Sequence, residues 1–325
     1  MRAILCKELG PADKLVIEDV PSPQVSGDGV KVKVKAAGLN FPDTLIIEGK
    51  YQIKPELPFS PGGEMAGEII EVGPDVKNLK PGMRVMGLTG YGSFAEEMVI
   101  SESRVIPVPD GMKDETAAAF SMVYGTRYHA LKQRAHMQRG ETLLVLGASG
   151  GVGLAAVELG KAMGAKVIAA ASTNDKLQVA KEAGADDLIN YTDEDLKDAL
   201  KSRYPQGIDV IYDPVGDRFT EPALRNMAWN GRFLIVGFAA GEIPKIPANL
   251  TLLKGCSVVG VFWGAFTAKE PKEHIQNVKE LMQLFAEGKI DPRVSEVFPF
   301  EQYEDALAAL SSRRAKGKVV LKVSD

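Results

Sequence analysis

A glycine-rich stretch near the middle of the chain constrains the fold more than any other feature of the sequence. It follows an apolar run and reads Leu143-Leu144-Val145-Leu146-Gly147-Ala148-Ser149-Gly150-Gly151-Val152-Gly153. Apolar residues then recur at helical spacing from Leu154 to Met163. This order predicts a buried strand, a tight turn that lacks Cβ atoms, and a helix that begins at the turn. The stretch therefore indicates a strand–helix–strand unit of a parallel sheet.

Strand-like apolar runs alternate with helical segments from about residue 122 onward. The predicted strands are Leu143–Leu146, Val167–Ala171, Asp187–Ile189, Val210–Tyr212, Phe233–Val236 and Val258–Val261. The helical segment 176–183 ends at Gly184, and glycine often terminates a helix. Such alternation predicts an α/β fold with a doubly wound parallel sheet of six strands and helices on both faces.

The first and last parts of the chain follow different patterns. Residues 31–35 alternate charged and apolar side chains, as a half-buried strand does, and Gly and Pro punctuate the first third. These features predict a β-barrel or β-sandwich. After residue 264, the pattern predicts two amphipathic helices, Glu273–Ala286 and Tyr303–Leu310, and a closing strand at 318–322. This last segment either extends the sheet domain or returns to the first domain.

Composition and charge exclude several classes of protein. Apolar residues make up 45% and charged residues 25% of the 325 residues, and the net charge is −4. This balance argues against a disordered chain and against a nucleic-acid partner, which a basic excess usually accompanies. No uncharged stretch is long enough for a membrane span, and the early Lys7-Glu8 pair interrupts any signal-peptide core. We therefore expect a cytoplasmic protein without membrane contact. The two cysteines, Cys6 and Cys256, are too few for a disulfide framework or a metal cage.

The glycine-rich turn has the chemistry of a dinucleotide site. Backbone N–H groups and the positive end of the helix dipole can hold a pyrophosphate there. NAD-binding folds usually carry an acidic residue at the end of the second strand, whereas this strand ends at Ala171 and leads into Ser172. A carboxylate would repel the 2′-phosphate of NADP, and the Ser172 hydroxyl and the Lys176 ammonium can bind it. The sequence therefore predicts NADP(H) as the cofactor, although Asp175 lies nearby.

Several motifs together resemble those of the medium-chain dehydrogenase/reductase superfamily, in particular its zinc-free quinone oxidoreductase branch, which includes zeta-crystallin. Besides the glycine-rich turn they are Ala37–Thr44, Pro61–Gly67, Gly90–Glu96, Asp213–Gly216 and Gly317–Leu321. The resemblance covers essentially the whole chain. It implies a GroES-like β-barrel domain at residues 1–121, a Rossmann domain at 122–264 and a return to the first domain at 265–325.

The same resemblance implies that the chain holds no metal. Zinc members carry Gly-His-Glu where this chain has Gly62-Gly63-Glu64, and a cysteine ligand where it has Asn40. A catalytic zinc needs about three protein ligands, mainly cysteine and histidine. Alcohol oxidation is hard to support without such a Lewis acid, whereas a quinone or an enone delocalises the charge that hydride addition creates.

The resemblance also points to side chains that would bind the hydride acceptor. Asn40 and Tyr51 match positions that line the quinone site of the family, and both can hydrogen-bond an acceptor oxygen. A second tyrosine of the family is replaced by Leu45 here, which indicates a more apolar pocket.

On the cofactor side, the resemblance implies five more residues. Thr126 matches a threonine beside the nicotinamide, and Gly237 with Phe238 fits the loop on the nicotinamide side. Tyr191 and Arg313 match residues near the 2′-phosphate. The carboxyl ends of the strands, where several of these residues lie, are also where parallel sheets bind ligands.

The function that follows is an NADPH-dependent oxidoreductase that transfers hydride to a quinone. One alternative keeps the cofactor and changes the acceptor to an α,β-unsaturated carbonyl compound: an alkenal, an enone, or an enoyl-CoA such as acrylyl-CoA. A second alternative is a non-catalytic NADPH- or RNA-binding protein of the crystallin type, which the negative net charge disfavours. The apolar run at 258–264 predicts an edge strand that pairs with a second copy to form a homodimer.

Overall fold

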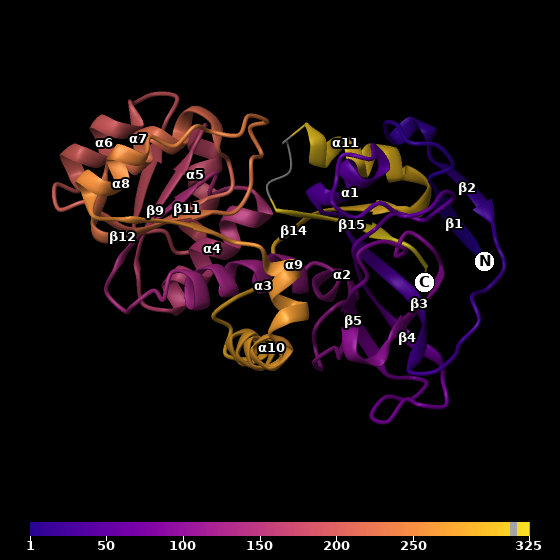
Figure 1. Cartoon of the computed structure of the whole chain (residues 1–325). Coiled ribbons are helices and arrows are strands. Elements are labelled where there is room, and N and C mark those ends of the chain that lie inside the picture. The colour runs from indigo at the N-terminus through magenta and orange to yellow at the C-terminus, as the bar shows by residue number, and fades with distance from the viewer. Residues whose placement is uncertain (313–316, 325) are drawn as a thin grey trace. The chain divides into compact units, whose positions relative to one another are not determined.

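The computed structural model describes residues 1–312 and 317–324, and the chain divides into two compact units (Figure 1). Unit 1 comprises Met1–Met122 and Pro292–Asp325, and unit 2 comprises Val123–Asp291. Each unit has its own sheet and its own apolar core. Within the described residues, no helix is both long and apolar enough to cross a membrane.

Unit 2 is built on a parallel sheet with the strand order β10-β9-β8-β11-β12-β13. Its strands are β8 (Thr142–Leu146), β9 (Lys166–Ala171), β10 (Asp187–Asn190), β11 (Ile208–Asp213), β12 (Met227–Ile235) and β13 (Ser257–Gly260). The six strands predicted from the sequence are all present, so the predicted Rossmann sheet is confirmed. The strand order reverses between β8 and β11, and open parallel sheets bind ligands at such a switch point.

Helices join the strands of unit 2 and bury its apolar runs. They are α3 (Ser121–His129, which begins in unit 1), α4 (Gly151–Ala162), α5 (Asn174–Glu182), α6 (Leu196–Arg203), α7 (Thr220–Leu224), α8 (Ala248–Lys254), α9 (Trp263–Lys269) and α10 (Pro271–Ala286). One core cluster includes Leu144 of β8, Ile168 of β9 and Ile211 of β11, all fully buried. The strands read as continuous apolar runs because a doubly wound sheet is covered on both faces.

Unit 1 contains a mostly antiparallel sheet in the order β14-β15-β3-β4-β5-β7, with β6 also paired to β3, and a separate β1-β2 pair. Its strands are β1 (Arg2–Leu5), β2 (Val16–Asp19), β3 (Gly29–Gly38), β4 (Glu64–Val72), β5 (Arg84–Leu88), β6 (Glu97–Ser101), β7 (Val105–Pro107), β14 (Val294–Pro299) and β15 (Lys318–Lys322). Its helices are α1 (Phe41–Ile47), α2 (Asp114–Ala117) and α11 (Tyr303–Ser311). The alternation at residues 31–35 falls in β3, where Val32 and Val34 are buried in the core.

The chain returns to unit 1 later than the sequence analysis expected. The expected boundary lies at about residue 265, but α9 and α10 belong to unit 2 and the return occurs at Pro292. Helix α9 packs closely on α3, because a Cβ on Gly125 would lie 2.2 Å from the Trp263 ring. Helix α10 is tied to the π-helical segment Ala130–Arg134 that continues α3, where the Lys132 ammonium lies 2.6 Å from the Glu280 carboxylate. These contacts hold both helices on the sheet domain, and β14, α11 and β15 return to unit 1.

Candidate active site

The glycine-rich turn lies at the switch point of the unit 2 sheet, between the end of β8 and the start of α4. Gly147 has a φ of +62°, a backbone conformation that favours glycine. The Ala148 N–H donates to the Ala170 carbonyl of β9 across 3.1 Å and ties the turn to the neighbouring strand. A Cβ on Gly153 would lie 2.3 Å from the Gly147 carbonyl oxygen. The helix can therefore start this close to the strand only with glycine at position 153.

The same turn leaves open space over the first turn of α4. A Cβ on Gly150 would meet no atom of the described residues within 4 Å. The first N–H groups of a helix lack intrahelical acceptors, and Gly150 provides no side-chain cap for this 12-residue helix. Open space over such N–H groups fits an anion, as the pyrophosphate of a dinucleotide would require.

Buried Asp213 shapes the turn after β11, on the other side of the switch point. Its carboxylate accepts hydrogen bonds from the N–H groups of Val215 (2.9 Å) and Gly216 (2.8 Å) and from the Thr220 hydroxyl (2.8 Å). Burial raises the pKa of Asp213, although these donors act to lower it. A Cβ on Gly147 would lie 2.8 Å from a Val215 methyl group. The Asp213 turn therefore forms the second wall of the switch point, a role that sequence reasoning did not assign to it.

Two of the predicted phosphate-binding residues meet at the carboxyl end of β9. The Lys176 ammonium donates to the Ser172 hydroxyl across 3.4 Å. Thr192, which the sequence analysis missed, donates its hydroxyl to the Ser172 carbonyl across 2.9 Å. Tyr191 follows β10, and its ring packs on Phe219 with centroids 4.4 Å apart. The structure thus places Ser172, Lys176 and Tyr191 at the ends of two neighbouring strands.

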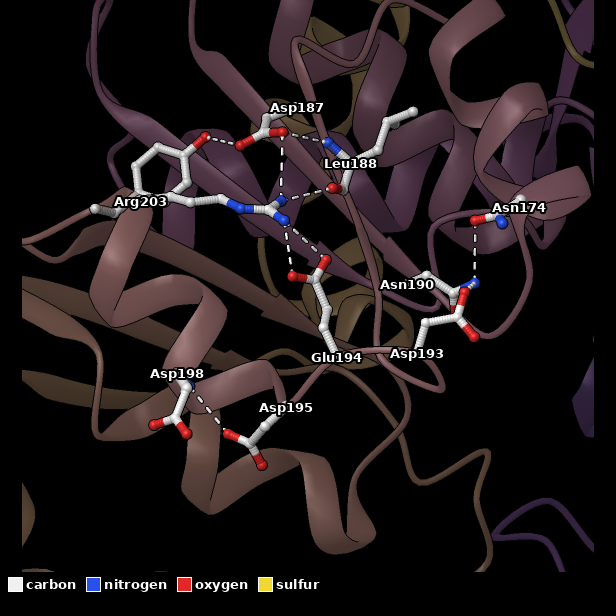
Figure 2. Close-up of polar contacts among 10 residues, drawn as sticks. Asn174, Asp187, Leu188, Asn190, Asp193, Glu194, Asp195, Asp198 and Arg203 are labelled. Carbon is white, nitrogen blue, oxygen red and sulfur yellow. Dashed lines mark hydrogen bonds and ion pairs between the residues drawn. The ribbon is translucent and has the colours of Figure 1, made fainter.

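An acidic run follows Thr192, and Figure 2 shows its carboxylates beside their partners. The pairs are Asp193 with the Asn190 amide (2.7 Å), Glu194 with the Arg203 guanidinium (2.7 Å), and Asp195 with the Asp198 N–H at the start of α6 (2.9 Å). Asn190 also donates to Asn174, the first residue of α5, across 3.0 Å. All three carboxylates are therefore engaged in the connection between β10 and α6.

The remaining predicted cofactor residues are placed as follows. Thr126 is half-buried in α3. Gly237 and Phe238 follow β12, and backbone hydrogen bonds of 2.9 and 3.0 Å join this turn to the turn after β11. Arg313 lies outside the described residues. Unit 2 therefore carries all of the predicted cofactor residues except Arg313. Thr126 lies in α3, and the others follow the strands of unit 2 at the edge of the sheet that contains the switch point.

In unit 1, four polar side chains form a buried group, which we call the buried polar group. Its members are Asn40 before α1, Asp43 in α1, Glu64 at the start of β4 and Lys318 at the start of β15, with exposed fractions of 8%, 1%, 0% and 5%. The Lys318 ammonium donates to the Asn40 amide oxygen (2.8 Å) and to the Glu64 carboxylate (3.1 Å). The Asn40 amide nitrogen donates to Glu64 (3.1 Å) and to the Gly38 carbonyl (3.1 Å). The side-chain oxygen and nitrogen of Asn40 therefore both have protein partners.

The loop after α1 brings Tyr51 under the influence of this group. Burial raises the pKa of Asp43 to about 7, although the Asn40 N–H and the Lys318 ammonium lower it. Burial also raises the pKa of half-buried Tyr51, and the negative charge of Asp43 adds to this shift. Among the described residues, no group hydrogen-bonds the Tyr51 hydroxyl. Tyr51 can therefore bind an acceptor oxygen directly, whereas Asn40 would first have to exchange one of its bonds.

Comparison with known proteins places the chain in a family. The "Alcohol dehydrogenase GroES-like domain" family matches residues 26–110, and the "Zinc-binding dehydrogenase" family matches residues 151–287. A protein of Nematostella vectensis named quinone oxidoreductase-like protein 2 homolog is 42% identical over 325 residues, which cover 98% of this chain and 88% of that protein. The chain belongs to the medium-chain dehydrogenase/reductase superfamily. The expected family and its GroES-like domain are thereby confirmed.

Two solved structures extend this result to the whole fold. The quinone oxidoreductase of Pseudomonas syringae pv. Tomato DC3000 superposes with a TM-score of 0.92 at 29% identity and covers 99% of both chains. The Escherichia coli quinone oxidoreductase complexed with NADPH gives a TM-score of 0.90 at 29% identity and covers 99% of this chain and 100% of that chain. This member of the superfamily is accordingly an oxidoreductase.

The residues of the buried polar group do not fit a zinc ion, although one matching family is described as a zinc-binding dehydrogenase. Asn40 and Gly63 offer neither thiolate nor imidazole, and the Glu64 carboxylate is paired with the Lys318 ammonium. Within residues 1–312 and 317–324, no three His, Cys, Asp or Glu side chains gather as a metal ion would need. A divalent cation beside this buried ammonium would also meet strong repulsion.

Sequence reasoning named Asn40 but missed the partners that hold it. Glu64 and Lys318 both lie in motifs of the family resemblance, yet 254 residues separate them in the chain. A charged residue at the first position of a short apolar strand was the one available signal, since Lys318 precedes three apolar residues in Gly317–Leu321. The pairing itself depends on the return of the chain end to unit 1.

Proposed function

We propose that the protein is an NADPH-dependent reductase that transfers hydride to a quinone without zinc. The contact of Ser172 with Lys176 carries the cofactor assignment, because it puts a hydroxyl and a cation at the end of β9, where NAD-binding folds usually carry an acidic residue. The names of the relatives support a quinone as the acceptor. Within residues 1–312 and 317–324 nothing hydrogen-bonds the Tyr51 hydroxyl, which supports a carbonyl oxygen as its ligand.

Each part of the chain has a defined task in this proposal. When bound, the cofactor supplies a hydride from the nicotinamide. The glycine-rich turn binds the pyrophosphate, Ser172 and Lys176 bind the 2′-phosphate, and Tyr191 lines the same end of the cofactor. Thr126, Gly237 and Phe238 are assigned to the nicotinamide end. Tyr51 donates a hydrogen bond to the acceptor oxygen, where negative charge develops as the hydride arrives.

The alternatives differ in the acceptor or in the presence of catalysis. Leu45 is a half-buried residue of α1 and indicates a more apolar pocket, which keeps an alkenal, an enone or an enoyl-CoA as alternative acceptors. A non-catalytic NADPH- or RNA-binding protein would need no side chains that bind a hydride acceptor. The proposal gives that task to Tyr51, which the buried polar group helps to position. Steady-state oxidation of NADPH with each class of acceptor separates these functions. The cytoplasmic location expected from the sequence stays a prediction.

Replacing Ser172 with aspartate tests the cofactor assignment. A carboxylate at the end of β9 would repel the 2′-phosphate and would accept hydrogen bonds from the ribose of NAD. We expect Ser172→Asp to weaken NADPH binding by about tenfold or more and to leave NADH binding equal or stronger, as measured by titration calorimetry. Ser172→Ala is the control that removes the hydroxyl without adding charge. Equal losses for the two cofactors would contradict the assignment.

We also propose a homodimer formed through β13, the last strand of the unit 2 sheet, whose Gly260 carbonyl accepts a hydrogen bond from Arg134. Exposed apolar side chains occur in the elements next to this strand: Trp229 in β12, Leu252 and Leu253 in α8, and Phe262 two residues after β13. An edge strand with apolar neighbours favours pairing with a second copy. We expect light scattering to show a dimer, and Leu252→Lys with Leu253→Lys to give monomers. Leu9→Lys, at an exposed site of unit 1, is the control. A monomeric wild-type protein would contradict this proposal.

A further inference from the structure

The Lys318 ammonium lies at the centre of the buried polar group. It is the first residue of β15, and its side chain is only 6% exposed. It donates to the Leu39 carbonyl (2.9 Å), to the Asn40 amide oxygen (2.8 Å) and to the Glu64 carboxylate (3.1 Å). An ammonium has three protons, so this group is fully used by the protein. Lys318 therefore joins the end of β3, the start of α1 and the start of β4 at one point.

The contacts of Lys318 determine how its neighbours are oriented. Because the ammonium takes the Asn40 amide oxygen, the Asn40 nitrogen must turn toward Glu64 and Gly38. The other Glu64 oxygen accepts from the Met122 N–H across 2.8 Å, so the carboxylate is held on both sides. The Asn40 N–H in turn donates to Asp43 across 2.7 Å, which fixes the first turn of α1. Helix α1 leads directly into the loop that carries Tyr51.

We propose that the Lys318 ammonium is the resident cation of the acceptor-binding part of unit 1 and acts there as a positioning residue in place of a metal ion. It holds Asn40 and Glu64, and through α1 it holds the segment that presents Tyr51. The statement that Lys318 positions residues for a hydride acceptor rests on the proposed function. The statement that Lys318 is the cation of the buried polar group is independent of it. Lys318 itself touches no acceptor, because its three protons are engaged.

This assignment has an electrostatic signature in the ionisation of Asp43. Lys318 from β15 and Glu64 from β4 act on that carboxyl through their charges, and the backbone N–H groups of Asn40 and Gly63 lower its pKa. Tyr51, in the loop after α1, is in turn affected by the charge of Asp43. Burial raises the pKa of Asp43 to about 7, the Lys318 charge lowers it and the Glu64 charge raises it. Removing Lys318 should therefore raise the pKa of Asp43, and removing the Glu64 charge should lower it. A nearby unit charge shifts a carboxyl pKa by about 1–3 units.

Infrared spectroscopy of the protein without cofactor or acceptor tests the signature. Two buried carboxyls should lose their carboxylic-acid C=O bands near pH 7 in wild type, Asp43 of unit 1 and Glu158 of α4, whose pKa burial also raises to about 7. Asp43→Asn should lack the Asp43 component and retain that of Glu158, so the Asp43 midpoint is read from the difference between each protein and its Asp43→Asn variant. Glu64→Gln should move the midpoint to lower pH and Lys318→Met to higher pH, each by about one unit. If Lys318→Met fails to fold, Glu64→Gln still decides the matter. An unchanged midpoint in Glu64→Gln, or one zinc ion per chain in the purified protein, would overturn the proposal.

Kinetics of a charge-neutral double variant tests the positioning role. Lys318→Met with Glu64→Gln removes both charges together, and we expect the KM for the acceptor to rise by about tenfold while the Kd for NADPH stays within about twofold of wild type. Lys318→Arg keeps the charge and should recover part of the loss. An unchanged KM and kcat in the double variant would overturn the positioning role. If wild type reduced no acceptor, the proposed function would fail while the infrared result would stand.

Discussion

Gly153→Ala is expected to destabilise unit 2 by about 2–3 kcal/mol and to weaken NADPH binding by about tenfold or more. The new Cβ would lie 2.3 Å from the Gly147 carbonyl oxygen and 2.6 Å from the Ala148 Cα. Both are backbone atoms, so the turn or the helix must move, and the N–H groups of the turn move with it. Urea unfolding and titration calorimetry measure the two effects.

Gly150→Ala is the matched variant in the same turn. Gly150 has a φ of −74°, and an added Cβ would meet no described atom within 4 Å. Its stability should stay within about 1 kcal/mol of wild type, because alanine fits this backbone. Its NADPH affinity should nevertheless fall, since the methyl group would fill the space that the pyrophosphate needs. Wild-type affinity in Gly150→Ala would contradict the placement of the pyrophosphate over α4.

Lys318→Met is expected to destabilise the protein by about 3–5 kcal/mol, the usual effect of leaving one partner of a buried ion pair alone. Glu64 has no solvent exposure, so its charge would have no counter-charge and no water. The double variant with Glu64→Gln should regain most of this loss, because neutral side chains of similar volume replace both ions. Urea unfolding at pH 7 of the single and double variants checks both statements. Equal stability of the single and the double variant would show that an unpaired Glu64 charge does not cause the loss of stability.

The stability of unit 1 should also depend on pH through Asp43. Its pKa is raised from 3.8 in the unfolded chain to about 7 in the fold. The folded state therefore binds more protons than the unfolded state between these values, and this contribution to stability is lost as pH rises from about 4 to 7. Asp43→Asn should lose this part of the pH dependence. The Lys318 variants should therefore be compared with wild type at fixed pH.

The sheet of unit 2 could be predicted because its strands carry their own signal. Leu143–Leu146 is a continuous apolar run that ends at a glycine-rich turn, and burial on both faces requires such a run. The same local logic predicted Ser172 and Lys176, which lie four residues apart at the end of one strand and the start of one helix. The 3.4 Å contact between them is the expected result of that spacing.

The buried polar group and the return point could not be predicted in this way. Lys318 meets Asn40 and Glu64 only because β15, near the end of the chain, pairs with β3, near its beginning. No local pattern encodes a partner more than 250 residues away. The late return at Pro292 likewise depends on the packing of Trp263 on Gly125, a tertiary contact that the apolar periodicity of α10 does not show.

The central claim is most directly tested by steady-state oxidation of NADPH and NADH with a panel of quinones, enones, alkenals and enoyl-CoA esters. Wild type should oxidise NADPH in preference to NADH and should reduce quinones faster than the other acceptors. Tyr51→Phe should lower turnover and leave the Kd for NADPH unchanged, because the hydroxyl that binds the acceptor oxygen is lost. Faster reduction of an enone or a CoA ester than of any quinone, or full turnover in Tyr51→Phe, would contradict the account.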